Sequence, residues 1–510
     1  MSSQKKHPLI TGTVILTLTG LITRVMGFFY RIFLSHTIGA EGVGIYQLIF
    51  PVYALCFSFA VAGIQTGISR CCASALAQKN PAKARSYFSC GFFLSFSLSV
   101  IVAALLHRYA GFLSRSLLKE PRCTPLLQLV AWSVPLGTVH TCVSAWFFAR
   151  KQTAIPSVSQ FLEQAARIFS SVFFYLILSE KGIAPTPLLA AAGLLAGELV
   201  ASLFSAICLL FHFQGTEYKT PSPLPVPSYA ACAGRLVALS LPLTVNRILL
   251  NLLQSGEAIL IPSRLRQYGC SSFQALSIYG ILTGMAFPFI LFPSAITNSV
   301  STMLLPTIAQ EQAKGNRKKI TSATEKTMKY CLLLGIFAGG IFFFFGNLLG
   351  TLVYGNQDAG TFIQILSFLC PFLYLTGTLS SILNGLGHTS LCFFQNVVGL
   401  SIRIFFILFA VPRAGIQGYL WGLLVSQLVT TLLNLFFLHQ KVSFSFYPLQ
   451  WLFLPLAFLV LSCGMGLFVF YLCDSLFSLP GLWNLGITMG VCGISYLTCL
   501  LCSKQIHISS

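Results

Sequence analysis

Long apolar stretches recur along almost the whole chain, and each is about as long as one crossing of a lipid bilayer. A transmembrane helix needs about 20 mostly apolar residues. Only 8% of the residues are charged, against about 25% in soluble domains. Since backbone polar groups in lipid must be satisfied internally, the pattern predicts an all-α polytopic membrane protein. The predicted crossings are about fourteen, at 10–34, 43–66, 87–107, 125–148, 157–178, 187–212, 234–262, 274–306, 328–350, 361–386, 389–411, 415–438, 449–472 and 482–502.

The basic residues predict how the chain is oriented. The formal net charge is +20, which in a soluble protein would suggest nucleic acid as a partner. If the N-terminus is inside, most Lys and Arg residues between the apolar stretches fall on the cytoplasmic side, as the positive-inside rule requires. The sequence therefore predicts a multi-pass protein of the plasma membrane with both termini in the cytoplasm and no nucleic-acid partner.

The two halves of the chain resemble each other. Pro135 corresponds to Pro371, and Arg167-Ile-Phe169 corresponds to Arg403-Ile-Phe405, in the same order along both halves. Each half has six crossings, an even number, so the halves are predicted to be parallel repeats. The predicted organisation is an N-lobe with helices 1–6 at 1–214, a Pro-rich cytoplasmic linker at 215–233, a C-lobe with helices 7–12 at 234–440, and helices 13–14 within 441–510.

Charged side chains inside the apolar stretches are the candidate functional residues, because a charge there costs roughly 2.5–3.5 kcal/mol on insertion scales and usually faces a cavity or a partner. Arginine is the side chain best suited to bind phosphate bidentately. We predict that four arginines are substrate-binding cations of an interior cavity; structural pairing or snorkelling is the alternative for the first two. The eight charges are Arg24, Arg31, Glu163, Arg167, Glu198, Arg247, Glu257 and Arg403, and the four cavity cations are Arg24, Arg31, Arg247 and Arg403.

The acidic residues have different predicted roles. Glu163 and Arg167 are spaced i, i+4, which favours a structural ion pair on one helix. Glu257, with Asn246, is a candidate for coupling to Na⁺ or a proton; a structural bond to a neighbouring arginine is the alternative. The scattered cysteines lack the paired spacing of a metal site, and no phosphate-binding loop of the Gly-x-x-x-x-Gly-Lys-Ser/Thr type occurs. No catalytic residue, metal or other cofactor is predicted.

Several motifs resemble a known group of membrane proteins: Thr23-Arg-Val-Met-Gly27, Gly39-Ala-Glu-Gly-Val-Gly-Ile-Tyr46, Glu257-Ala-Ile-Leu-Ile-Pro-Ser-Arg264 and Tyr279-Gly-Ile-Leu-Thr-Gly-Met-Ala-Phe-Pro288. With six plus six plus two crossings, the chain resembles the multidrug/oligosaccharidyl-lipid/polysaccharide exporter superfamily. Within it, the likeness is to polysaccharide biosynthesis proteins of the stage V sporulation protein B type, relatives of the lipid II flippase.

The resemblance implies a bacterial flippase whose two lobes open alternately. It would move an anionic polyprenyl-pyrophosphate-linked oligosaccharide outward, such as a peptidoglycan precursor or a related cell-wall or spore-cortex unit, with membrane lipids and cell-wall synthesis enzymes as partners. Arg24 matches an arginine that is important in the lipid II flippase. Thr283 stands where that flippase carries a further arginine, so the cationic set of this chain differs. The glycan, the coupling ion and the growth stage stay open.

Two other functions are compatible with parts of the pattern. A multidrug or cation antiporter of the same superfamily should carry uncompensated carboxylates, whereas here five arginines accompany three acids in the crossings. A membrane glycan polymerase or ligase should have a large outer loop with catalytic side chains, and the predicted outer loops are short. The sequence therefore favours a transporter over an enzyme.

Overall fold

The computed structural model describes residues 8–213, 228–477 and 480–503, and every regular element in these ranges is a helix. Thirteen helical stretches among the described residues are long and apolar enough to cross a membrane. The first of them, Ile15–Ala77, has 63 residues. At 1.5 Å per residue it is roughly three times as long as the hydrocarbon core is thick, and it holds two of the predicted crossings. The predicted all-α polytopic class is confirmed.

A glycine divides that first stretch. Helix α1 (Pro8–Phe57) is interrupted at Gly39, whose backbone angles are φ 69° and ψ 177°. This region of backbone space is occupied almost only by glycine. The interruption lies between the predicted crossings at 10–34 and 43–66, so the chain turns there without a long loop.

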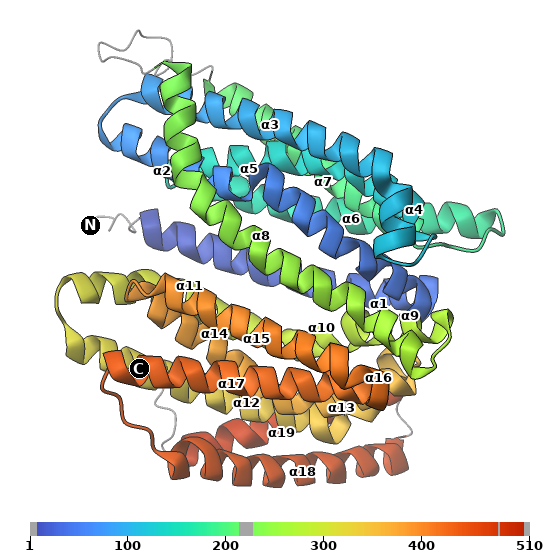
Figure 1. The fold of residues 1–510 in the computed structure, drawn as a ribbon. Coiled ribbons are helices and arrows are strands. Elements are labelled where there is room, and N and C mark those ends of the chain that lie inside the picture. Colours follow the sequence, from blue (N-terminus) through green and yellow to red (C-terminus); the bar gives the residue numbers. More distant parts are fainter. Residues whose placement is uncertain (1–7, 214–227, 478–479, 504–510) are drawn as a thin grey trace. The chain divides into compact units, whose positions relative to one another are not determined.

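The helices form two compact units. The first comprises residues 1–263 and 271–280, and the second comprises 264–270 and 281–510. In Figure 1 the first unit runs from blue to green along the chain. Its helices after α1 are α2 (Gly63–Ala77), α3 (Pro81–Phe112), α4 (Cys123–Ala131), α5 (Ser133–Ala149), α6 (Ala154–Glu180), α7 (Leu188–Phe213), most of α8 (Tyr229–Tyr268), and α9 (Ser272–Gly280).

Helix α8 packs on the first unit through both apolar and polar contacts. Leu236 is completely buried in a core that also contains Trp146. Further along α8, the Asn251 amide donates to the Ser58 hydroxyl, and the Ser255 hydroxyl donates to the carbonyl oxygen of Pro51 at 3.1 Å. The predicted C-lobe at 234–440 thus begins with a helix that belongs to the first unit up to Ser263. The division into lobes at the linker stays a prediction, and residues 214–227 lie outside the described residues.

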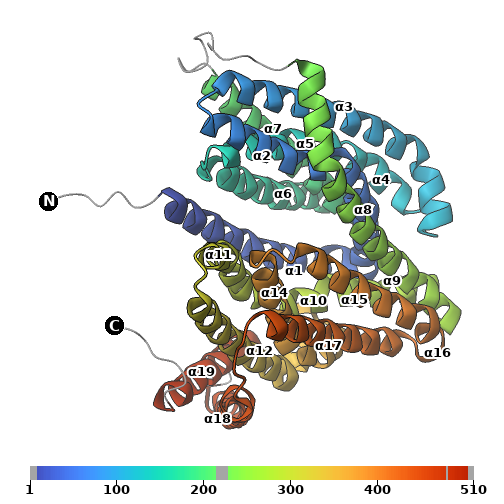
Figure 2. The same ribbon diagram turned by 60° about the vertical axis from the view of Figure 1, so that its left-hand side comes forward.

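The second unit is built from the remaining helices, which Figure 2 shows in yellow to red. Pro293 is the N-cap residue of helix α11, so the predicted crossing at 274–306 is interrupted at this proline. The Tyr374 hydroxyl donates to the carbonyl oxygen of Ile290 at 2.7 Å and ties two of the helices together. The helices are α10 (Phe287–Leu291), α11 (Ser294–Ala313), α12 (Arg317–Tyr354), α13 (Gln357–Leu366), α14 (Cys370–Gly385), α15 (Thr389–Phe409), α16 (Val411–Ala414), α17 (Ile416–Lys441), α18 (Leu454–Phe477) and α19 (Gly481–Cys502).

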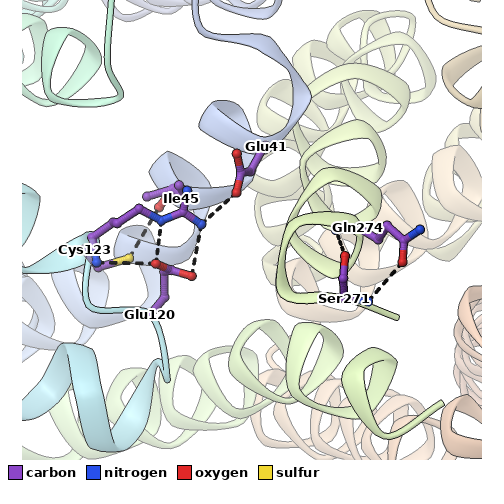
Figure 3. Close-up of polar contacts among 7 residues, drawn as sticks. Glu41, Ile45, Glu120, Cys123, Ser271 and Gln274 are labelled. Carbon is purple, nitrogen blue, oxygen red and sulfur yellow. Dashed lines mark hydrogen bonds and ion pairs between the residues drawn. The ribbon is translucent and has the colours of Figure 1, made fainter. Parts of the chain in front are cut away.

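An ion-pair group joins two predicted outer loops of the first unit. Arg122 contacts Glu41 and Glu120, each at 2.7 Å. Figure 3 shows both carboxylates, together with the carbonyl of Ile45, which accepts from the thiol of Cys123. Hydrogen bonding to Glu120 and then to Glu41 raises the pKa of the Arg122 guanidinium. The group places the segment after the first crossing and the segment before α4 at the same end of the unit.

Candidate functional site

Two glycines bring α6 and α7 unusually close together. A Cβ atom on Gly193 would lie 2.1 Å from the hydroxyl of Ser171, and one on Gly197 would lie 2.7 Å from the carbonyl oxygen of Glu163. Small residues four apart allow helices to approach in this way inside membranes. The approach places Glu198, the residue after Gly197, beside the charged residues of α6.

A charged and polar cluster lies at this crossing. Arg167 Nη2 lies 2.5 Å from Glu163 Oε1, and the other oxygen of Glu163 is 4.0 Å from His140 Nε2. The second imidazole nitrogen of His140 lies 3.3 Å from the hydroxyl of Ser159. An imidazole nitrogen of His140 and one carboxylate oxygen each of Glu163 and Glu198 all lie within 4.8 Å of one another. Helices α5, α6 and α7 therefore meet at one group of ionisable side chains.

Glu198 is the most enclosed member of the cluster, with 7% of its surface exposed. Its Oε1 accepts a hydrogen bond from the Tyr53 hydroxyl of α1 at 3.2 Å. Its Oε2 is buried and has no hydrogen-bond partner among the described residues. That oxygen fits against Gly137, where a Cβ atom would lie only 3.1 Å away. A buried carboxylate oxygen without a partner is energetically costly.

A cavity of ≈ 300 Å³ opens beside this cluster. The size is at the lower end of the range for small-molecule sites, about 300–1,000 Å³. Arginines from α1 and α6 line it together with two amides and two phenol rings. The polar lining residues are Tyr30, Arg31, Tyr46, Gln47, Gln164 and Arg167. Guanidinium groups with neighbouring amide and hydroxyl donors suit an anion that carries several acceptor oxygens.

The structure places the sequence-predicted site residues in different surroundings. Arg31 is partly buried and lines the cavity. Arg24, two turns earlier on α1, is exposed, and so are Asn246 and Arg247 on α8. Glu257 is buried, with 7% of its surface exposed. Only Arg31 of the four predicted cavity cations lies in this cavity, and their roles in binding stay predictions.

Arg403 lies on α15 in the second unit and is partly buried. Its repeat counterpart Arg167 belongs to the first unit. Arg247 also belongs to the first unit, because α8 up to Ser263 packs there. Three of the four predicted cations thus belong to the first unit. Arg247 follows the predicted linker in the sequence, and its position there suggested the second half instead.

Sequence reasoning did not foresee the partners around Glu163 and Arg167. His140 reads as an isolated histidine and Glu198 as a local helix–helix contact when each is considered on its own helix. Gln47 and Gln164 carry no signal, because neutral amides are unremarkable in a membrane helix. The Gly193 and Gly197 spacing is the one available hint, since it predicts a close helix crossing next to an intramembrane carboxylate.

Comparison with known proteins assigns the family. Residues 9–312 match the family described as polysaccharide biosynthesis protein. The chain belongs to this family. Residues 248–409 also match the MatE family, and both matches place the protein in the multidrug/oligosaccharidyl-lipid/polysaccharide exporter superfamily that its motifs resemble. The resemblance inferred from the sequence is confirmed.

Individual relatives agree with this assignment. Stage V sporulation protein B of Bacillus subtilis (strain 168) is 27% identical over 432 residues, which are 84% of this chain and 83% of that protein. The lipid II flippase MurJ of the same bacterium is 21% identical over 422 residues, covering 78% and 76% of the two chains.

A solved structure, the lipid II flippase MurJ in an inward closed conformation, has a TM-score of 0.69 with 16% identity, covering 95% of this chain and 98% of that one. At this identity the likeness shows the fold. The protein is a multi-pass membrane transporter of the polysaccharide biosynthesis family, related to flippases.

Proposed function

We propose that the protein is a flippase that moves an anionic, polyprenyl-pyrophosphate-linked oligosaccharide outward across the plasma membrane by alternating access. The substrate class is a peptidoglycan precursor or a related cell-wall or spore-cortex unit. Both termini lie in the cytoplasm in this proposal. Membrane lipids and the enzymes that make or use the glycan are the partners, and H⁺ or Na⁺ is the coupling ion.

The cavity beside Arg31 and Arg167 is the observation that carries this proposal. Two arginines of helices long enough to span a membrane, Arg31 and Arg167, line one polar cavity with Gln47 and Gln164. Pyrophosphate offers several charged oxygens, which arginine binds better than other side chains do. The family match and the relatedness to stage V sporulation protein B and a lipid II flippase support the same class of substrate.

The membrane potential favours this direction of transport. Each negative charge that leaves an inside-negative cell gains about 2.3 kcal/mol per 100 mV. A pyrophosphate that carries two negative charges gains about twice as much. An outward flippase for such a lipid therefore needs no nucleotide, in keeping with the lack of a phosphate-binding loop motif in the sequence.

Transport can be tested with the purified protein in liposomes. Fluorescent polyprenyl-pyrophosphate-linked glycan is placed in the membrane, and its exposure to an external quencher is followed over time under an inside-negative potential. We expect Arg31→Ala to slow exposure at least tenfold, because it removes a cavity cation. Arg115→Ala is the matched control: Arg115 is exposed and does not line the cavity, so its variant should keep the wild-type rate.

Two results would contradict the proposal. The first is a rate of lipid exposure no higher than in protein-free liposomes, although wild type and Arg115→Ala both elute as folded proteins in size-exclusion chromatography. The second is equal rates for Arg31→Ala and wild type, which would remove the cavity from the mechanism.

An antiporter for cationic drugs is the second candidate, because residues 248–409 match the MatE family. Glu257 lies within this match and is buried, as a carboxylate that binds a cation would be. Drug efflux from cells separates the two functions. Efflux that persists in Arg31→Ala and is lost in Glu257→Gln would favour the antiporter over the flippase.

A further inference from the structure

The cluster formed by His140, Glu163, Arg167 and Glu198 does not neutralise its own charge. Two carboxylates share one guanidinium, and Arg167 contacts Glu163 at 2.5 Å. With neutral His140 the four side chains carry one excess negative charge. The excess belongs to Glu198, whose Oε2 is buried and has no hydrogen-bond partner among the described residues. Two buried carboxylates close together are rarely both ionised.

Helices α1, α4, α5 and α6 pack against α7, and three of them present polar or ionisable groups to Glu198. Glu163 and Arg167 lie on α6, His140 on α5, and Tyr53 on α1, where its hydroxyl donates to Glu198 Oε1. Helix α4 contributes no side chain that ionises apart from the thiol of Cys123. Arg167, the cation of this cluster, already contacts the competing carboxylate of Glu163, so a proton on the acid pair would balance the remaining charge.

The second unit contains the same framework without the two carboxylates: Arg403 stands at the position of Arg167, but neither glutamate has an acidic counterpart. The offset of 236 residues that relates Pro135 to Pro371 also relates His140 to Thr376 and Glu163 to Gly399. Gln427 occupies the place of Glu198 by the offset of 229 residues that relates Gly193-Leu-Leu195 to Gly422-Leu-Leu424. Its amide donates to the Thr376 hydroxyl at 2.9 Å. This crossing of helices therefore forms without either carboxylate, so the two carboxylates of the first unit are not needed for packing.

We propose that Glu198, supported by Glu163 and His140, is a binding site for one exchangeable proton in the first unit. An imidazole nitrogen and two carboxylates are groups that hold and pass protons near neutral pH. A hard cation such as Na⁺ prefers a shell made of oxygen atoms, and here one of the three donors is nitrogen. Arg167 joins the proton site to the cavity, because this residue both contacts Glu163 and lines the cavity.

Because Arg167 belongs both to the proton site and to the cavity, the proton can have a role in transport. This part of the inference rests on the proposed function. An anionic headgroup that binds Arg167 competes with Glu163 for the guanidinium. When the headgroup takes the guanidinium, the negative charge of Glu163 is left without a partner. A proton taken up by the pair Glu163 and Glu198 then neutralises that charge. Headgroup binding and proton uptake should therefore favour each other.

Infrared difference spectroscopy tests the site directly in the purified, full-length protein. The wild type should show the carbonyl stretch of a protonated carboxylic acid that disappears when the pH is raised. Glu198→Gln should remove that band. Glu257→Gln tests the competing assignment, because Glu257 is a second buried intramembrane carboxylate with the same exposed fraction, 7%. Its variant should retain the band.

Folding of Glu198→Gln is expected, since Gln427 serves at the corresponding position, and its elution as a single species in size-exclusion chromatography verifies it. A band that persists in Glu198→Gln, or one that Glu257→Gln abolishes instead, would overturn the assignment. A band lost on addition of Na⁺ but not of K⁺ at constant pH would show a metal-cation site and equally overturn it. Insensitivity of the band to both salts supports the proton site.

Liposome transport then separates the site from the proposed function. The wild-type exposure rate should increase when the lumen is more acidic than the external medium, because the proton and the headgroup then move outward together, and Glu198→Gln should lose that dependence. If Glu198→Gln keeps it, the coupling role is wrong. If no variant moves the lipid while the infrared band behaves as expected, the proposed function fails and the proton site stands.

Discussion

Gly44 and Gly280 meet where α1 crosses α9: a Cβ atom on Gly280 would lie 2.6 Å from the backbone nitrogen of Gly44 and 2.1 Å from the carbonyl oxygen of Ala40. The backbones of the two helices are thus in direct contact. Glycine at both positions is the reason, since any side chain would separate the helices. This contact fixes α9 to the first unit, although α9 begins more than 200 residues after the end of α1 along the chain.

Gly44→Ala is expected to destabilise the protein by roughly 1–3 kcal/mol, the usual cost of inserting a methyl group where no space exists. Its Cβ atom would lie 2.1 Å from the carbonyl oxygen of Leu276, a backbone atom that cannot rotate away. Gly20→Ala on the same helix is the control, because nothing lies within 4 Å of its Cβ position. Thermal unfolding in detergent measures both; an equal midpoint for the two variants would contradict the predicted clash.

Gly39→Ala tests backbone strain instead of steric crowding. No atom lies within 4 Å of the Cβ position, so the predicted loss of about 1–3 kcal/mol arises from the backbone angles φ 69° and ψ 177° alone. Gly111→Ala, which also has free space but has no positive φ, should be nearly neutral. Unfolding midpoints again provide the measurement. A neutral Gly39→Ala would mean that the turn between the first two crossings tolerates other angles.

Arg167→Ala is expected to be destabilising, by roughly 1–3 kcal/mol, because it leaves the Glu163 carboxylate, 18% exposed, without its cation. The double variant Glu163→Gln, Arg167→Gln should recover much of that loss, since both charges are removed together. Comparing the two variants by thermal unfolding identifies a structural ion pair. If the double variant is as unstable as Arg167→Ala alone, the pair is not the source of the stability.

The group around Arg122 should contribute little to stability. Half of the Arg122 side chain is exposed, and exposed ion pairs give about 0.2–1 kcal/mol in double-mutant cycles. Glu41→Gln and Arg122→Gln, alone and combined, should yield a coupling energy in that range that decreases as salt is added. A salt-independent coupling of several kcal/mol would indicate that the group is shielded from water.

The sequence predicted the fold class because the bilayer leaves few alternatives for a chain with so many apolar stretches. The spacing of Glu163 and Arg167 likewise places them on one helix face. The neighbours of that pair could not be predicted in the same way. His140 and Glu198 lie on other helices, and which helices pack together depends on contacts such as those of Gly193 and Gly197 with α6.

The location of α8 shows the same limit at a larger scale. The Pro-rich linker precedes α8, and a boundary in sequence suggests a boundary in space. Leu236, Asn251 and Ser255 nevertheless contact the first unit. These contacts are made by side chains that are ordinary in composition, so no local pattern distinguishes them from residues that would face the second unit.

The sequence by itself determined that this protein is a helical membrane protein with an internal repeat and a small set of intramembrane charges. Hydrophobicity, length and residue spacing act locally, and they are sufficient for those conclusions. Tertiary structure alone decided which charges meet. Arg31 joins Arg167 at a cavity, and Glu198 joins Glu163 and His140. Helix packing at glycine contacts sets those distances, and the energy of a buried charge depends on its neighbours in space.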